Sequence, residues 1–352
     1  MQKIYKIIAM LFVLAILSHT HVNVYAQNKD EFSNKCSEIV IDSRTNRILY
    51  QNNAYEKKYM ASTTKILTAI VVIENCNIND IVTIKKETTG IEGSSIYLEE
   101  GEKLSVMDLL YGLMLRSGND CAITLATHCS GSIKNFAELM NKMAKKIGAI
   151  ESNFTNPHGL HDDNHYTTAY DLAIISSYAL KNPIFKQIVS TKKIEIPFTT
   201  REFNRVLFNK NKMLKEFEGS TGIKTGFTKK AGRCLVSSCE RNGLELISVV
   251  LNCPPMFERS KTLLSNCFND YKAYNVLESD NILDFIDSER GKIAITIKND
   301  VILPLTENEY KNLRIEYEYP SYLSDFSNNE IGLIKFFCEN NLIFTEKIYT
   351  II

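Results

Sequence analysis

The order of the strand-like and helical segments constrains the fold of this chain more than any other feature. Two short β-rich runs come first, at 36–42 and 47–50, on either side of a polar turn. Helical patterns then fill most of 62–180, and strand-like runs return over 193–251 before a helical pattern at 259–268. This order predicts an α+β fold in which helices pack on an antiparallel sheet, with the first hairpin joined to strands from the far end of the domain.

The sequence changes character after about Leu277. Segments such as 292–298 and 333–337 alternate apolar and polar residues, and turns rich in Asn and Asp separate them. We therefore predict a small C-terminal all-β domain at 276–352, which follows a larger domain at 27–275.

The N-terminus has the pattern of a signal peptide. Lys3 and Lys6 precede the apolar run 7–17, and the segment 24–26 has small residues, Val24 and Ala26, at the two positions that a signal peptidase reads, with cleavage after Ala26. The apolar run is about half as long as a membrane-spanning helix and ends in polar residues, which argues against a membrane anchor. We predict that residues 1–26 are removed and that the mature protein is exported to the cell envelope.

The charge and the cysteines exclude several classes of protein. The 352-residue chain carries 41 basic and 41 acidic side chains, so its net charge gives no reason to expect binding to nucleic acid. Its nine cysteines form no C-x-x-C pair and no zinc-ligand spacing. We expect most of them to be small buried hydrophobic residues, a usage that fits an exterior that is not strongly oxidising.

Ser62 and Lys65 stand three residues apart at the start of an apolar helical stretch, 66–73. On a helix, this spacing places two side chains on one face, about 5 to 6 Å apart, so the amine can reach the hydroxyl. A lysine acts as a base near neutral pH only if burial or another cation lowers its pKa. Taken alone the motif is weak, because a serine at a helix start is usually only a cap.

Two further motifs follow in the chain. Ser117 and Asn119 lie in an expected loop between helices, where they offer a second hydroxyl and a side-chain amide. Lys224, Thr225 and Gly226 lie on an expected strand, with a cation and a hydroxyl that suit a carboxylate and a glycine that permits close approach of a ligand. The three motifs in this order are the set found in penicillin-binding proteins and class A β-lactamases.

On these motifs the chain resembles the serine-type D-alanyl-D-alanine carboxypeptidases, which are low-molecular-weight penicillin-binding proteins. The resemblance implies a β-lactamase/penicillin-binding-protein transpeptidase-like fold, and it runs from about Cys36 to the end. The segments that carry it are 60–65, 115–120, 156–160, 165–173 and 219–228.

The resemblance implies that Ser62 attacks the peptide bond between the last two D-alanines of a peptidoglycan stem peptide and forms an acyl-enzyme. Lys65 would accept the hydroxyl proton, and Ser117 would pass a proton to the leaving amine. The backbone N–H groups of Ser62 and Phe227 would form the oxyanion hole. Water then frees the enzyme, and β-lactams such as penicillin inhibit it by acylating the same serine.

The same resemblance assigns the substrate contacts. Asn119 would hold the peptide carbonyl, and Lys224 and Thr225 would hold the terminal carboxylate, beside Gly226 and Phe227. No cofactor and no metal are expected. His158, His161 and His165 lie close together in a loop, and hydrogen bonding within that loop explains them better than a zinc site does.

Three alternative functions remain: two enzymes with the same catalytic residues and one binding module with an inactive site. A β-lactamase needs a carboxylate to activate the deacylating water, but the nearest segment, 151–155, departs from the class A E-x-x-L-N pattern at Phe154 and Thr155. A DD-endopeptidase that cuts wall cross-links would carry the same motifs. An inactive wall-binding module would have no need of the full set of catalytic side chains.

The C-terminal end departs from the resemblance. Relatives commonly finish with an amphipathic helix on the membrane, whereas 342–352 has a strand pattern without a basic polar face. We therefore predict a mature enzyme that is soluble or associated with the wall.

Overall fold

The computed structural model describes residues 36–279, 281–324 and 329–351. The predicted signal peptide lies outside these residues, so it stays a prediction. Within the described residues, no helix has the length and apolar character needed to cross a membrane.

A five-stranded antiparallel sheet forms the centre of the larger domain. Its strand order is β2-β1-β9-β8-β7, and β1 of the first hairpin pairs with β9 from the far end of the domain. The predicted joining of early and late strands is therefore confirmed. The strands are β1 (Ser37–Asp42), β2 (Ile48–Asn52), β7 (Ser220–Thr228), β8 (Gly232–Arg241) and β9 (Leu244–Leu251).

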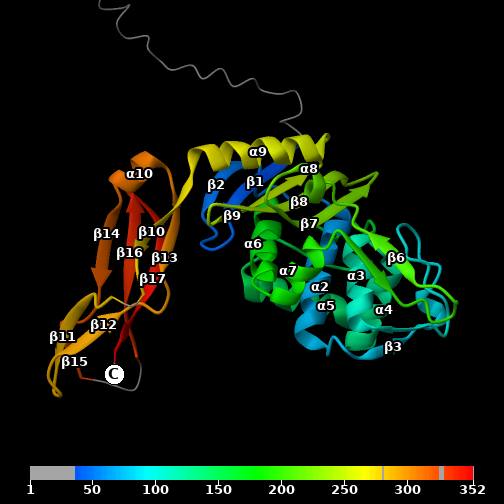
Figure 1. Ribbon diagram of the computed structural model, residues 1–352, viewed down its shortest axis with the longest axis horizontal. Coiled ribbons are helices and arrows are strands. Elements are labelled where there is room, and N and C mark those ends of the chain that lie inside the picture. Colours follow the sequence, from blue (N-terminus) through cyan, green and yellow to red (C-terminus); the bar gives the residue numbers. More distant parts are fainter. Residues whose placement is uncertain (1–35, 280, 325–328, 352) are drawn as a thin grey trace, which may run out of the picture. The chain divides into compact units, whose positions relative to one another are not determined.

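Helices cover both faces of this sheet, as Figure 1 shows. Helix α9 (Met256–Asp270) lies on one face, and α6 (Ala169–Leu180) and α7 (Pro183–Ser190) pack on the other. The alternation along β1 explains the two layers, because Ile39 belongs to the apolar cluster under α6 whereas Val40 belongs to the cluster under α9.

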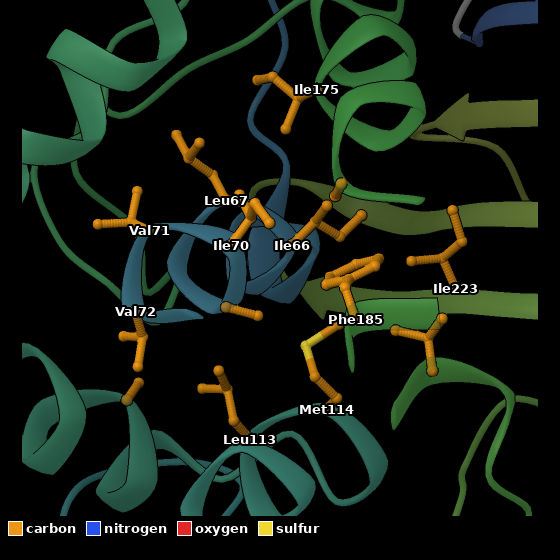
Figure 2. Packing of buried hydrophobic residues seen from close by; sticks show 14 of the residues in the cluster. Ile66, Leu67, Ile70, Val71, Val72, Leu113, Met114, Ile175, Phe185 and Ile223 are labelled. Carbon is orange, nitrogen blue, oxygen red and sulfur yellow. The ribbon is translucent and has the colours of Figure 1, made fainter. Parts of the chain in front are cut away.

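Helix α2 (Lys65–Asn75) runs through the middle of the larger cluster. Figure 2 shows its side chains surrounded by residues from α3, α6, α7 and β7. A helix that is apolar on all sides is buried, and every residue from Lys65 to Val72 is buried here. The surrounding helices are α3 (Val106–Leu115), α4 (Asn119–Ser130) and α5 (Ile133–Ile147).

The smaller elements complete this domain. The strand expected at 193–198 forms a separate hairpin and does not join the main sheet, because β5 pairs only with β6, a strand that the sequence did not predict. The remaining elements are η1 (Ala61–Thr64), β3 (Ile81–Thr83), η2 (Lys86–Thr88), β4 (Lys103–Ser105), β5 (Lys193–Ile196), β6 (Arg205–Phe208) and α8 (Met213–Glu216).

The C-terminal all-β domain is confirmed. A six-stranded sheet has the order β14-β16-β17-β12-β11-β15, β10 pairs with β13, and these strands share an apolar cluster of their own. The predicted boundary at 275/276 falls within β10 and stays a prediction. The elements are β10 (Lys272–Leu277), β11 (Asp284–Ser288), β12 (Ile293–Thr296), β13 (Val301–Leu305), α10 (Glu307–Lys311), β14 (Arg314–Glu318), β15 (Tyr322–Leu323), β16 (Glu330–Cys338) and β17 (Asn341–Thr350).

The cysteines are mostly single and buried, with one exception that the sequence did not predict. Cys36 and Cys253 form a disulfide across 217 residues of sequence. Of the seven free cysteines, five are buried, as expected for small hydrophobic residues.

Candidate active site

Ser62 lies on the single turn η1, directly before α2. The N-cap residues of these two elements are Met60 and Thr64, and neither cap uses a side-chain hydrogen bond, so Ser62 is not a helix cap. A Cβ at Gly159 would lie 1.9 Å from the Ala61 carbonyl oxygen, so the loop that carries Gly159 packs directly against the turn. The position of Ser62 is therefore set by backbone packing.

Lys65 is completely buried and lies among three neutral oxygen atoms. Its Nζ is 3.2 Å from Ser62 Oγ, 2.7 Å from Asn119 Oδ1 and 2.6 Å from the carbonyl oxygen of His158. Burial lowers the pKa of Lys65 well below its usual value, and the positive charge of Lys224 lowers it further. The serine and the amine are thus within hydrogen-bonding reach, as their spacing predicts.

Ser117 and Asn119 lie where α3 ends and α4 begins. Ser117 is almost fully buried and has a φ of 65°, a left-handed conformation that is uncommon for serine. The Asn119 amide nitrogen donates to the Glu92 carbonyl oxygen at 2.6 Å, and its backbone N–H donates to the Ser94 carbonyl oxygen at 2.7 Å. These contacts hold the second motif against the segment that contains Ser94.

The third motif lies on β7, one of the two edge strands of the main sheet. Lys224 is buried, and its Nζ donates to the Thr225 carbonyl oxygen at 2.9 Å. Burial, with a smaller effect from the charge of Lys210, lowers the pKa of Lys224 to about 7. A Cβ at Gly226 would lie 3.1 Å from the backbone nitrogen of Ser62, so glycine lets β7 approach the serine turn closely.

One cavity of about 350 Å³ opens onto these residues, and we call it the Ser62 cavity. Five predicted site residues line it, while Lys65, Asn119 and Lys224 are buried beside it. The full lining is Ser62, Ser94, Ser117, Lys210, Thr225, Gly226, Phe227, Arg233, Met256 and Phe257.

The sequence reasoning missed five of these lining residues. Ser94, Lys210, Arg233, Met256 and Phe257 come from four separate segments, and none belongs to a recognised motif. Lys210 is positioned by a hydrogen bond from its Nζ to Ser94 Oγ at 3.2 Å. The Ser62 cavity therefore contains cations beyond the motif lysines.

Asp120 was also missed, although it directly follows the second motif. Its carboxylate accepts hydrogen bonds from Ser95 Oγ at 2.5 Å and from the backbone N–H groups of Ile96 and Leu98 at 3.1 and 3.2 Å. This buried carboxylate ties the segment that contains Ser94 to the start of α4. An acid directly after S-x-N was the available signal.

The three loop histidines have different surroundings. His165 Nδ1 accepts from the Thr155 backbone N–H at 3.0 Å, so its Nε2 carries the proton and faces Thr64 Oγ1 at 2.8 Å. Burial lowers the pKa of His165 to about 4 and that of His158 to about 3. His161 lies 3.3 Å from an Asp163 carboxylate oxygen. Hydrogen bonding within the loop therefore accounts for His165, whose contacts support the serine turn.

Several known proteins are similar to this chain in sequence and in fold. The family model of the S11 peptidases, D-alanyl-D-alanine carboxypeptidases, matches residues 23–254. D-alanyl-D-alanine carboxypeptidase DacF of Bacillus subtilis is 31% identical over 288 residues, which cover 78% of this chain and 74% of the relative.

Solved structures agree. Penicillin-binding protein 5 from Haemophilus influenzae has a TM-score of 0.78 at 28% identity, covering 90% of this chain and 96% of that one. A mutant of the Streptomyces K15 DD-transpeptidase has a TM-score of 0.62 at 32% identity, covering 65% of this chain and 95% of that one. The expected penicillin-binding-protein fold is confirmed. This chain therefore belongs to the S11 family of serine peptidases, the D-alanyl-D-alanine carboxypeptidases.

Proposed function

We propose that this protein removes the terminal D-alanine from peptidoglycan stem pentapeptides through an acyl-enzyme on Ser62. The observation that carries the proposal is the buried Lys65 amine, 3.2 Å from Ser62 Oγ at the edge of the Ser62 cavity. Family membership supports the class of reaction, and the geometry supports the roles that we propose for the residues.

Lys65 is the base that activates Ser62. A neutral amine has two N–H donors and one lone pair. The oxygens of Asn119 and His158 accept the two N–H groups, so the lone pair is left for the Ser62 hydroxyl. Burial and the Lys224 charge favour this neutral form of Lys65, since both lower its pKa.

The substrate's carbonyl lies between the serine turn and β7. Ser62 Oγ attacks the carbonyl carbon of the penultimate D-alanine, and the backbone N–H groups of Ser62 and Phe227 stabilise the oxyanion. The close approach at Gly226 supports this pairing of backbones. Asn119 orients the peptide through its side-chain amide.

Collapse of the tetrahedral intermediate breaks the C–N bond and releases D-alanine. The leaving nitrogen takes the proton that Lys65 removed from Ser62, passed through the Ser117 hydroxyl on the cavity wall. Water then adds to the ester carbonyl, Ser62 regains its proton, and the shortened stem peptide leaves. Thr225 and Lys224 bind the terminal carboxylate during the first half of this cycle.

The expected location follows from the substrate. We propose that the signal peptide 1–26 directs the chain out of the cytoplasm and that the mature protein consists of the catalytic domain at 27–275 and the β domain at 276–352. The enzyme would then act in the cell envelope, where it meets peptidoglycan and β-lactams.

A β-lactamase is less well supported. The Ser62 cavity has no acidic side chain among its lining residues, although deacylation in class A enzymes requires one. Glu151, the nearest sequence candidate, forms an ion pair with Lys57 at 3.2 Å, and both side chains are more than half exposed. It therefore has the surroundings of a surface residue.

Transpeptidation is the second candidate reaction. The Streptomyces relative is named a DD-transpeptidase, and an amine acceptor in place of water would convert the same acyl-enzyme into a cross-linked product. D-alanine release with and without an added amino-acid acceptor separates the two reactions, because only a transpeptidase transfers the acyl group.

The test is intact-protein mass spectrometry of residues 27–352 with benzylpenicillin, followed by D-alanine release from a stem pentapeptide. We expect one stable penicilloyl adduct on Ser62 and none on Ser62→Ala. Drug hydrolysis without an adduct would indicate a β-lactamase. An intact drug and no D-alanine would indicate an inactive wall-binding module.

A further inference from the structure

The Ser62 cavity has a strongly one-sided charge. Its lining contains two cationic side chains, Lys210 and Arg233, and no acidic one. Lys224 adds a third cationic group, buried beside the cavity. A ligand with a carboxylate is therefore favoured electrostatically, and the question is which cation meets it.

The positive charges of Lys224 and Lys210 depend on pH, whereas that of an arginine does not. The Lys224 ammonium is buried, already donates to the Thr225 carbonyl oxygen, and has a pKa of about 7. Lys210 is exposed and donates to Ser94 Oγ, and partial desolvation together with the charge of Arg116 lowers its pKa. Lys224 therefore loses its charge as the pH rises above neutrality, and Lys210 loses its charge at a lower pH than an ordinary lysine does.

Arg233 differs from these lysines in exposure and in partners. It lies on β8 directly opposite Phe227 of β7. Its guanidinium carbon lies over the Phe227 ring, 4.8 Å from the ring centroid. The side chain is exposed, and among the described residues no carboxylate forms an ion pair with it. A guanidinium stays charged throughout the working pH range and binds carboxylates through two parallel hydrogen bonds.

Another arginine on the same strand shows the contrast. Arg241 donates from Nε and Nη2 to the Glu218 carbonyl oxygen, at 3.0 and 2.9 Å, so its hydrogen-bonding groups are used inside the protein. Among the residues that the structure describes, the Arg233 side chain contacts the Phe227 ring and forms no hydrogen bond or ion pair, and it lines the Ser62 cavity. Its donors remain available to a substrate.

We propose that Arg233 is a specificity-determining residue that binds the terminal carboxylate of the substrate, an assignment that rests on the proposed function. The contact with Phe227 holds the guanidinium beside the backbone that would form the oxyanion hole. Thr225 and Lys224 complete the carboxylate site from β7, and the Lys224 charge also lowers the pKa of Lys65.

The experiment compares ligands that differ only in this carboxylate. Benzylpenicillin and its methyl ester are used for the rate of acylation of Ser62, and a stem pentapeptide and its C-terminal amide are used for kcat/KM. For Arg233→Gln we expect the acid to lose at least about 10-fold in rate while the ester and the amide change by less than about 3-fold.

Two variants control this experiment. Lys230→Gln removes a charge from the β7–β8 turn outside the lining of the Ser62 cavity and should keep the wild-type ratio of acid to ester. Arg233→Lys keeps the charge without the fork and should give an intermediate ratio.

Failure of the Arg233 assignment and failure of the proposed function give different results. An unchanged ratio of acid to ester in Arg233→Gln, or an equal loss for both, overturns the assignment. If the wild type forms the penicilloyl adduct but releases no D-alanine from the pentapeptide, the proposed function fails, while the penicillin acid-to-ester ratio still decides the role of Arg233.

Discussion

The two sides of the main sheet bury their charges in opposite ways. On the α9 side, the buried carboxylate of Glu38 accepts from Arg259 Nε and Nη2 at 2.7 and 2.8 Å, and Tyr50 Oη donates to it at 3.0 Å. Beside the Ser62 cavity, Lys65 and Lys224 are buried with neutral oxygens as hydrogen-bond partners, and neither forms an ion pair among the described residues.

We infer from this difference that the paired charges serve stability and that the unpaired ones serve the proposed chemistry. A buried carboxylate with a forked guanidinium is compensated, and removing one partner leaves an isolated charge. A buried ammonium without a counter-ion destabilises the folded state, but its lowered pKa makes it a usable base. The uncommon backbone of Ser117 belongs to the second region as well.

Lys65→Met should produce the largest effect. The substitution removes the amine that is hydrogen-bonded to Ser62 Oγ, so we expect acylation by benzylpenicillin to fall by at least about 10³-fold. The rate is measured by stopped-flow fluorescence or by mass spectrometry with time. A decrease of less than tenfold would show that another group activates the serine.

Glu38→Gln should destabilise the α9 side of the sheet, where the buried carboxylate is paired with an arginine. The substitution removes the buried carboxylate that pairs with Arg259, so we expect the free energy of unfolding to fall by about 3 kcal/mol, at the lower end for broken buried ion pairs. Acylation of the folded variant should stay within about twofold of the wild type, because Glu38 does not line the Ser62 cavity.

Glu258→Gln is the matched control for that variant. Glu258 also lies on the α9 side and pairs with Lys261 at 3.1 Å, but its side chain is 69% exposed. Its effect on the free energy of unfolding should be below about 0.5 kcal/mol. Equal losses for the two glutamate variants would remove the distinction between buried and exposed pairs.

Lys224→Met should change stability less than Glu38→Gln does, and in the opposite direction. The substitution removes an uncompensated buried ammonium, so we expect the free energy of unfolding at pH 6 to rise by about 2 kcal/mol. Because the folded pKa of about 7 lies below the usual lysine value, the unfolded state binds more protons above pH 7. The destabilisation by Lys224 is therefore complete below pH 7 and fades as the pH rises toward 10, and the gain from the variant fades with it.

The same variant should also move the pH dependence of acylation. The Lys224 charge lowers the pKa of Lys65, so its removal raises that pKa and shifts the acidic limb of the rate profile to higher pH. Urea unfolding at several pH values and a pH–rate profile measure both effects. A limb that stays in place would show that Lys224 does not act on the base.

Local patterns explain why much of the molecule was predictable. The spacing of Ser62 and Lys65 acts through helix geometry alone, and the apolar character of 66–73 already requires a buried helix. Alternation identified the β domain, because one face of each strand must be apolar. These features depend on residues within one or two turns of each other.

Contacts between distant segments were not predictable in the same way. Arg233 enters the Ser62 cavity only because β8 pairs with β7 in one register, and a shift of one residue would turn it to the other face of the sheet. The Cys36 and Cys253 disulfide likewise depends on β1 being placed beside the end of β9.

The sequence by itself therefore determined the order of the elements, the three motifs and the family. Only the tertiary structure decided that Lys65 and Lys224 are buried without counter-ions while Glu38 has one. The physical reason is that burial and charge compensation depend on neighbours that are remote in sequence, and these two quantities set the pKa values on which the chemistry depends.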